Sequence, residues 1–310
     1  MDRTTLRILD ALARSLGRPP SIRALTAAVR RRSGTAYYAN VYRKVQELAR
    51  DDLVALEKAG AASLASLNLD NRRLIDLLAE LELRNTQAFL QGRPAWGFLL
   101  RELEQLGFAS LCLSRPEQNA RLNRAEVLGL GDGRPWPELQ RLAEKHDLRL
   151  DCLLLSEREF RSLLAGREAN PAKDLLIDKI AFFSPQAFWL ALSSAAVRIP
   201  ERETDPAKLP ERDLLFNLAR FGYRELGPRL QPAAPVCLEY LVTALLLRGD
   251  ARRVRAIPSL LAANPANLAV LRFLAQKHGV AAALARAGKP PGEPLPQPAD
   301  AGKPRRPRHA

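Results

Sequence analysis

The residues best suited to recognition chemistry lie between positions 21 and 69. Arginine and lysine supply the charge that dominates affinity for phosphates, whereas tyrosine hydroxyls reach phosphate oxygens. Asparagine can read adenine and arginine can read guanine at base edges. The candidates for contact with nucleic acid are Arg30, Arg31, Arg32, Tyr37, Tyr38, Asn40, Arg43, Lys44 and Lys58. Tyr38 has an alternative assignment to the core, because it stands three residues before Val41.

The pattern around these residues predicts helix, turn, helix and hairpin. Ser21 can cap a helix, residues 31–35 have turn chemistry, and a second helix is expected over residues 36–50. The spacing of Val41, Val45 and Leu48 gives this second helix one buried face. Residues 53–57 and 63–69 alternate as two strands. With a first helix over residues 4–16, this order predicts a winged helix-turn-helix that binds double-stranded DNA. The alternative is a solvated basic helix without a partner.

A long helix is expected over residues 71–90, with Leu74, Leu77, Leu78 and Leu81 along one side. This leucine stripe can pack on the first helix or form the seam of a homodimer, since winged-helix proteins often bind two half-sites. Both alternatives are open. The first domain is expected to span residues 1–90.

Composition favours a globular protein with an anionic partner. The chain has 310 residues, 47% hydrophobic content and a net charge of +14, which favours nucleic acid over membrane. The three cysteines are far apart and stand in apolar runs, so buried free thiols are expected and structural zinc is not. Without a signal peptide or a run of membrane-spanning length, the sequence predicts a cytoplasmic protein with no membrane contact.

The run from Tyr38 to Leu48, together with residues 66–69, resembles the winged-helix half of a prokaryotic family. That family joins this domain to a minimal nucleotidyltransferase domain of the polymerase-beta type. The resemblance is good over residues 4–85 and weaker to residue 196. It implies a nucleotidyltransferase-like domain over residues 95–197, where strands are expected at 108–113, 125–130, 148–155 and 179–183.

Nucleotidyl transfer in such a domain needs a Gly-Ser turn for the phosphates and three carboxylates that hold two metal ions. Here Ser114 and Arg115 stand where the Gly-Ser turn belongs, and Arg124 stands in place of the first acid. Glu126 and Asp151 match the other two acids. A guanidinium at a metal position reverses the local charge. We therefore expect no catalytic residues and no cofactor, with Glu126 and Asp151 as remnants; an active enzyme that uses Mg²⁺ is the alternative.

The remainder of the chain predicts a helical bundle over residues 207–287 and a disordered, basic, proline-rich tail over residues 288–310. Helices are expected at 212–226, 235–247, 252–263, 267–277 and 280–286. The arginines at 252, 253 and 255 are either a solvated face or a second nucleic-acid contact.

The expected fold class is α+β and mostly helical: a winged helix-turn-helix, a small α/β nucleotidyltransferase-like palm and a C-terminal helical bundle. The expected function is sequence-specific DNA binding by a transcriptional regulator whose central domain is inactive. The alternatives are an active metal-dependent nucleotidyltransferase and a helical scaffold for protein interactions.

Overall fold

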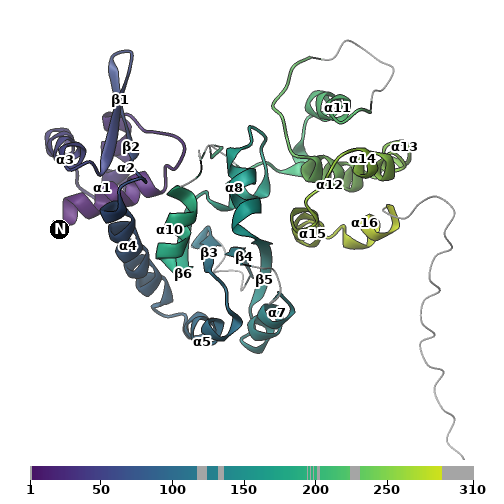
Figure 1. Cartoon of the computed structure of the whole chain (residues 1–310), viewed down its shortest axis with the longest axis horizontal. Coiled ribbons are helices and arrows are strands. Elements are labelled where there is room, and N and C mark those ends of the chain that lie inside the picture. Colours follow the sequence, from purple (N-terminus) through teal and green to yellow (C-terminus); the bar gives the residue numbers. More distant parts are fainter. Residues whose placement is uncertain are drawn as a thin grey trace, which may run out of the picture.

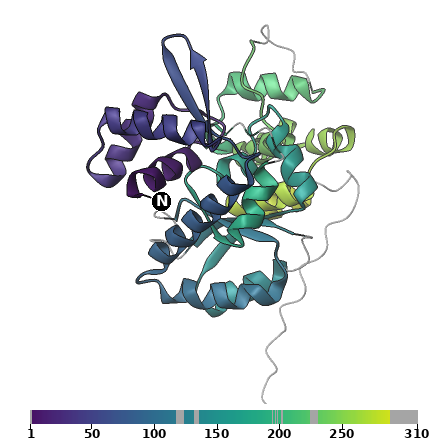
Figure 2. The same cartoon turned by 60° about the vertical axis from the view of Figure 1, so that its left-hand side comes forward.

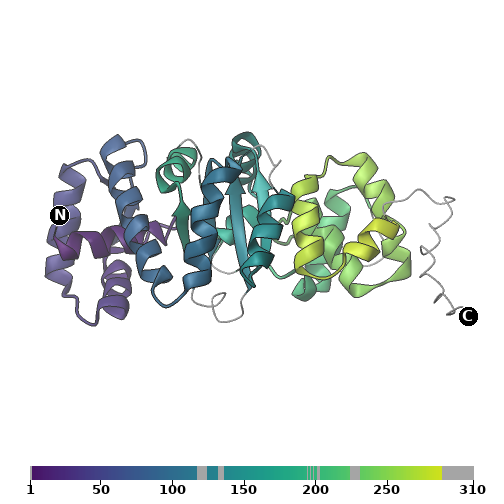
Figure 3. The same cartoon turned by 90° about the horizontal axis from the view of Figure 1, so that it is seen from below.

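The computed structural model describes residues 2–116, 124–131, 136–193, 195, 197, 199–200, 203–223 and 231–287. The chain is α+β and mostly helical, as predicted, with a two-stranded and a four-stranded sheet in its described part. The N-terminal helices, the larger sheet and the C-terminal helices follow one another along the long axis (Figures 1 and 3). The predicted disordered tail lies outside the described residues.

Three helices and a hairpin form the N-terminal unit. The helices are α1 (Arg3–Ala13), α2 (Ile22–Ser33) and α3 (Tyr38–Arg50), and the antiparallel strands are β1 (Val54–Ala59) and β2 (Ala62–Leu67). Ser21 caps α2 by accepting a hydrogen bond from the Ala24 N–H at 3.2 Å, as expected for a serine in this position. The predicted helices and hairpin are confirmed with three changes of bounds: α1 ends at Ala13 and not at residue 16, α2 continues to Ser33 into the predicted turn, and α3 begins at Tyr38 and not at residue 36.

The long helix α4 (Arg72–Leu90) connects the N-terminal unit to the central sheet. It contacts α1 on one side, and α10 (Pro185–Ser193) and strand β6 (Lys179–Phe183) on the other (Figure 1). Leu74 and Leu78 are fully buried within this packing. The leucine stripe therefore packs inside the chain, which is one of the two expected arrangements.

The central sheet has the strand order β5-β4-β3-β6. Its strands are β3 (Ser110–Ser114), β4 (Arg124–Leu130), β5 (Arg149–Leu155) and β6 (Lys179–Phe183). β4 and β5 are parallel, whereas β3 is antiparallel to both β4 and β6. Helices α5 (Pro94–Leu103) and α7 (Trp136–Lys145) cover one face, and α8 (Glu157–Ala165) and α10 cover the other (Figure 1). A 3-10 turn, η1 (Glu104–Leu106), follows α5. All four predicted strands are confirmed.

Helix α9 (Pro171–Leu175) was not predicted. It is a single buried turn with Pro171 in its first turn, and the Asn170 side chain caps it by accepting a hydrogen bond from the Lys173 N–H. So short a segment shows no helical periodicity in the sequence.

The C-terminal unit contains the turn η3 (Pro206–Lys208) and six helices in its described part. They are α11 (Glu211–Arg220), α12 (Leu238–Arg248), α13 (Ala251–Val254), α14 (Ile257–Ala263), α15 (Leu268–Lys277) and α16 (Ala281–Ala287). Helix α12 is almost completely buried, as predicted for the central helix of a bundle.

Three boundaries in this unit were wrong. The helix predicted over residues 212–226 ends at Arg220. The single helix predicted over residues 252–263 is divided into α13 and α14, because Pro258 occupies the first turn of α14 and cannot continue a preceding helix. The helix predicted from Pro235 begins at Leu238, because Val236 pairs as an isolated bridge with Ala169.

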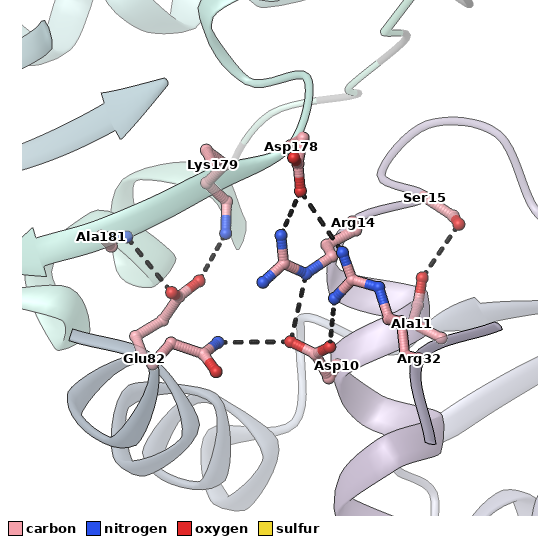
Figure 4. A network of polar contacts seen from close by, with 10 residues as sticks. Asp10, Ala11, Arg14, Ser15, Arg32, Glu82, Asp178, Lys179 and Ala181 are labelled. Atoms are coloured by element: carbon pink, nitrogen blue, oxygen red, sulfur yellow. Dashed lines mark hydrogen bonds and ion pairs between the residues drawn. The ribbon is translucent and has the colours of Figure 1, made fainter. Parts of the chain in front are cut away.

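A network of ion pairs fixes the N-terminal unit to the central sheet (Figure 4). Asp10 of α1 contacts Arg14 and Arg32, and both arginines also contact Asp178, which directly precedes β6. Burial alone raises the pKa of Asp10, but the charges of Arg14 and Arg32 hold that pKa below its usual value. The carboxylate is therefore ionised at neutral pH and binds both guanidinium groups.

A second ion pair lies deeper in the same junction (Figure 4). Lys179 Nζ lies 2.5 Å from Glu82 Oε1 of α4, and both side chains are almost fully buried. Glu82 Oε2 also accepts a hydrogen bond from the Ala181 N–H at 3.2 Å. Nζ of Lys179 also lies 4.2 Å from the centre of the Trp189 ring. This arrangement satisfies the buried charges on both partners.

Among the described residues, no helix combines the length and the apolar character needed to span a membrane.

Candidate functional sites

The outer face of α3 carries the first candidate site. Val41, Val45 and Leu48 are buried, so the opposite side of the helix faces outward. Asn40 and Arg43 are exposed there. Three aromatic side chains join them: Tyr37 is 71% exposed, Tyr38 is 51% exposed and Tyr42 is 43% exposed. Such a cluster of exposed large side chains marks a surface that can contact a partner.

Tyr38 does not belong to the core. Its ring stacks on that of Tyr42, with 6.0 Å between the ring centres and 30° between the ring planes. The alternative assignment of Tyr38 to core packing is therefore wrong. The burial of the helix comes from the valine and leucine stripe alone.

Helix α3 lies at the outer end of the molecule, away from the central sheet (Figure 1). The β1–β2 hairpin projects from the same unit (Figure 2), and Lys58 is exposed near the tip of the hairpin. No other described element covers this face of α3, because its main contacts are with α1, α2 and β1.

The cationic candidates fall into two groups. Arg31 is exposed and has no partner among the described residues, and Arg43 is 70% exposed with Glu47 at 3.9 Å. Arg32, in contrast, lies 2.6 Å from Asp10 and 3.4 Å from Asp178.

Two further cationic candidates have partners within their own unit. Lys44 contacts Glu47 at 2.6 Å and Asp2 at 3.0 Å, and hydrogen bonds to these carboxylates raise the pKa of Lys44. Arg30 donates to the Ala36 carbonyl at 3.0 and 3.2 Å. Arg30 therefore stabilises the turn between α2 and α3 while its side chain stays exposed.

Sequence reasoning missed two exposed residues of this surface, Tyr42 and Arg23. Tyr42 follows Tyr38 by four residues, and positions four apart share a helix face. Arg23 stands off the Ile22, Leu25 and Val29 stripe of α2, next to Arg30 on the exposed side. Both signals are visible in the sequence once the buried stripes are assigned.

The second candidate site is the start of strands β4 and β5, where Glu126 and Asp151 are neighbours in register. Arg124 Nε lies 2.6 Å from Asp151 Oδ2. The Asp151 side chain is buried, whereas the Arg124 side chain is 47% exposed. Its Nη2 also donates to the Lys277 carbonyl at 3.3 Å.

Glu126 has a different partner from the C-terminal unit. Lys277 Nζ lies 2.8 Å from Glu126 Oε1 and also contacts Glu203. Glu203 in turn lies 2.5 Å from Arg115 Nη1. The structure therefore brings Arg124, Glu126 and Asp151 together at the same end of the parallel strands β4 and β5. A cationic side chain is bound to each of the two acids.

Asp174 lies within the same polar region and was not anticipated from the sequence. Its Oδ2 accepts hydrogen bonds from the Tyr240 hydroxyl and, at 3.0 Å, from the Thr204 N–H. Burial raises the pKa of Asp174 to about 7, although these two hydrogen bonds oppose the shift. Its other oxygen, Oδ1, is buried without a hydrogen-bond partner, as are Arg115 Nη2 and Glu126 Oε2.

These groups do not fit the metal site that the nucleotidyltransferase resemblance implies. Two divalent ions need carboxylates whose negative charge is not already balanced by cationic side chains. The Arg124 guanidinium binds Asp151 and stands where the first carboxylate is expected, and the Lys277 ammonium binds Glu126.

Comparisons with protein-family models, with curated proteins and with solved structures found no match to this chain.

Proposed function

We propose that this chain is a sequence-specific double-stranded DNA-binding protein that acts as a transcriptional regulator. In this proposal, residues 1–90 form a winged helix-turn-helix. The observation that carries it is the contrast within the first part of α3, where Asn40, Arg43 and three tyrosines are exposed while the stripe of Val41, Val45 and Leu48 is fully buried. Such a face suits a recognition helix, whose polar side enters the major groove.

In this proposal each group of residues has a different task. Asn40 and Arg43 read base edges in the major groove, because their side chains can form paired hydrogen bonds with adenine and guanine. Arg31 contacts a phosphate, since its charge has no partner among the described residues. Lys58 extends the phosphate contact through the hairpin. Tyr37 and Tyr42 border the same surface with large exposed rings.

The central unit, in the same proposal, is a nucleotidyltransferase-like domain without catalytic activity. The contact of Arg124 with Asp151 at 2.6 Å supports this part. A guanidinium bound to the last acid repels a divalent cation and competes for its ligand. The unit then serves as a scaffold between the DNA-binding helices and the C-terminal bundle.

Selection from a pool of random DNA duplexes tests the DNA-binding proposal. The native protein is expected to enrich a defined motif and to bind it at least tenfold more tightly than a scrambled duplex. Each good base contact contributes about 1–3 kcal/mol of discrimination. The double variant Asn40→Ala, Arg43→Ala is expected to lose this discrimination and to retain weak, salt-dependent binding.

Arg141→Ala is the matched control, because Arg141 is an exposed arginine of α7 without a partner among the described residues. It removes a positive charge from α7, a helix that lies far from α3 (Figure 1), and its motif should equal that of the native protein. Enrichment of the same motif by the double variant would contradict the proposed reading face.

Incubation with each radiolabelled nucleoside triphosphate and Mg²⁺ tests the inactive central domain. We expect no labelling of the protein or of added RNA. Metal-dependent labelling that is lost in Glu126→Ala but kept in Arg141→Ala would overturn this part of the proposal and leave the DNA-binding part intact.

A further inference from the structure

A hollow between α2 and the beginning of α3 lies beside the proposed reading face. It is lined by Arg23, Thr26, Ala27, Arg30 and Tyr38 and encloses about 420 Å³. The first four residues belong to α2, where Arg23, Ala27 and Arg30 are exposed and Thr26 is buried, and Tyr38 is the first residue of α3. The hollow is therefore formed at the corner where the two helices of the helix-turn-helix meet.

The lining of this hollow is cationic and contains no carboxylate. Arg23 is exposed and forms no hydrogen bond or ion pair with any described residue. Arg30 uses Nε and Nη2 to bind the Ala36 carbonyl, which leaves Nη1 available. The Thr26 hydroxyl is occupied, since it donates to the Ile22 carbonyl at 2.8 Å. Two guanidinium groups and the Tyr38 hydroxyl thus remain as donors for an anion.

The beginning of α3 adds to this positive potential. Tyr37 occupies the N-cap position and provides no side-chain hydrogen bond to the first N–H groups of the helix. Uncapped N–H groups and the helix dipole favour an anion at this end. The hollow and the uncapped end lie together, because Tyr38 belongs to both.

We propose that this hollow seats a phosphate group of the DNA backbone, held by Arg23, the free Nη1 of Arg30 and the Tyr38 hydroxyl. Guanidinium groups bind phosphate oxygens through short, charge-assisted hydrogen bonds. This inference rests on the proposed DNA-binding function. It gives Tyr38 a specific function. A phosphate held beside Tyr38, at the beginning of α3, fixes the depth at which Asn40 and Arg43 enter the major groove.

The salt dependence of DNA affinity distinguishes an anchored phosphate from diffuse attraction. Removal of one phosphate contact lowers the slope of log K against log salt by about 0.9. We expect Arg23→Ala to lower the slope by about this amount while the selected motif stays the same. Arg141→Ala should leave both the slope and the motif unchanged. Far-UV circular dichroism should show native helix content in both variants, because both side chains are exposed and neither is paired with a described residue.

The same chemistry suits free inorganic phosphate, so a second arm measures phosphate binding to the full chain by calorimetry, with chloride as the reference anion. Phosphate binding that is lost in Arg23→Ala, while the DNA salt slope stays unchanged, would assign the hollow to a free anion and overturn the inference. An unchanged slope without phosphate binding would also overturn it and leave the DNA-binding function standing. Absence of any duplex binding by the native protein would overturn both.

Discussion

The two candidate sites of this protein contain similar cationic side chains in opposite electrostatic situations. On the outer side of α2 and α3, Arg23 and Arg31 have no partner among the described residues. At the start of β4 and β5, Arg124 binds Asp151 and Lys277 binds Glu126. Both regions carry cationic side chains, so they look alike in the sequence. Only in the first region are cations left without a carboxylate partner, and these can bind an anionic molecule.

The difference has a physical origin in desolvation. A buried acid is costly unless a cation or hydrogen-bond donors satisfy it. Asp151 is only 6% exposed, so the Arg124 guanidinium serves the fold of the sheet edge. The Arg31 guanidinium stays hydrated, so it has no free energy of desolvation to offset. Its charge is therefore available for a phosphate. Paired cations should therefore matter for folding, and unpaired cations should matter for binding.

The largest expected effect is on the buried pair of Glu82 and Lys179. Lys179→Ala leaves the Glu82 carboxylate buried without its cation, which costs about 3–5 kcal/mol of unfolding free energy. The double variant Glu82→Leu, Lys179→Met should recover much of this loss, because both charges are removed together. Denaturant unfolding followed by circular dichroism measures both changes. A loss below about 1 kcal/mol in Lys179→Ala would show that the pair does not stabilise the junction.

A smaller effect is expected at Asp174, whose pKa is raised by burial from 3.8 to about 7. The folded state holds the proton more tightly than the unfolded state. The contribution of Asp174 to the free energy of unfolding is therefore fully present below pH 3.8. It decreases as the pH rises toward 7 and is lost above that pH. Asp174→Asn cannot ionise, so its stability relative to the native protein should rise by about 2–3 kcal/mol between pH 5 and pH 7. Parallel pH dependence of the two proteins would contradict the raised pKa.

The smallest expected effect comes from the adjacent arginines of α2, which compare an unpaired with a paired cation directly. Arg31→Ala should change stability by less than about 0.5 kcal/mol, and it should lower the salt slope of DNA binding by about 0.9. Arg32→Ala breaks the contacts with Asp10 and Asp178. It should cost up to about 1 kcal/mol of stability and leave the salt slope unchanged. Equal slopes in the two variants would contradict the distinction between unpaired and paired cations.

The sequence was sufficient for features that depend on local spacing. The stripe of Val41, Val45 and Leu48 predicted both the burial of α3 and its outward polar face. Short continuous apolar runs located the strands of the central sheet. These patterns are repeated within a few residues, so they are readable without tertiary information.

The partners of charged residues could not be predicted, because they come from distant parts of the chain. Arg32 meets Asp178, which is 146 residues away, and Arg124 meets Asp151, which is 27 residues away. Lys277 reaches Glu126 only because α15 packs against β5. Local patterns contain no information on such contacts. The sequence therefore predicted the outward position of Arg43 on α3, but it could not separate Arg31 from Arg32 on α2.

Amide hydrogen exchange of the full chain, with and without a selected duplex, tests most directly whether the outer face of α3 binds DNA. We expect slower exchange over residues 37–43 and at the hairpin tip around Lys58, with little change in residues 203–223 and 231–287. Protection confined to the C-terminal helices, or no protection of α3 at a saturating DNA concentration, would contradict the account.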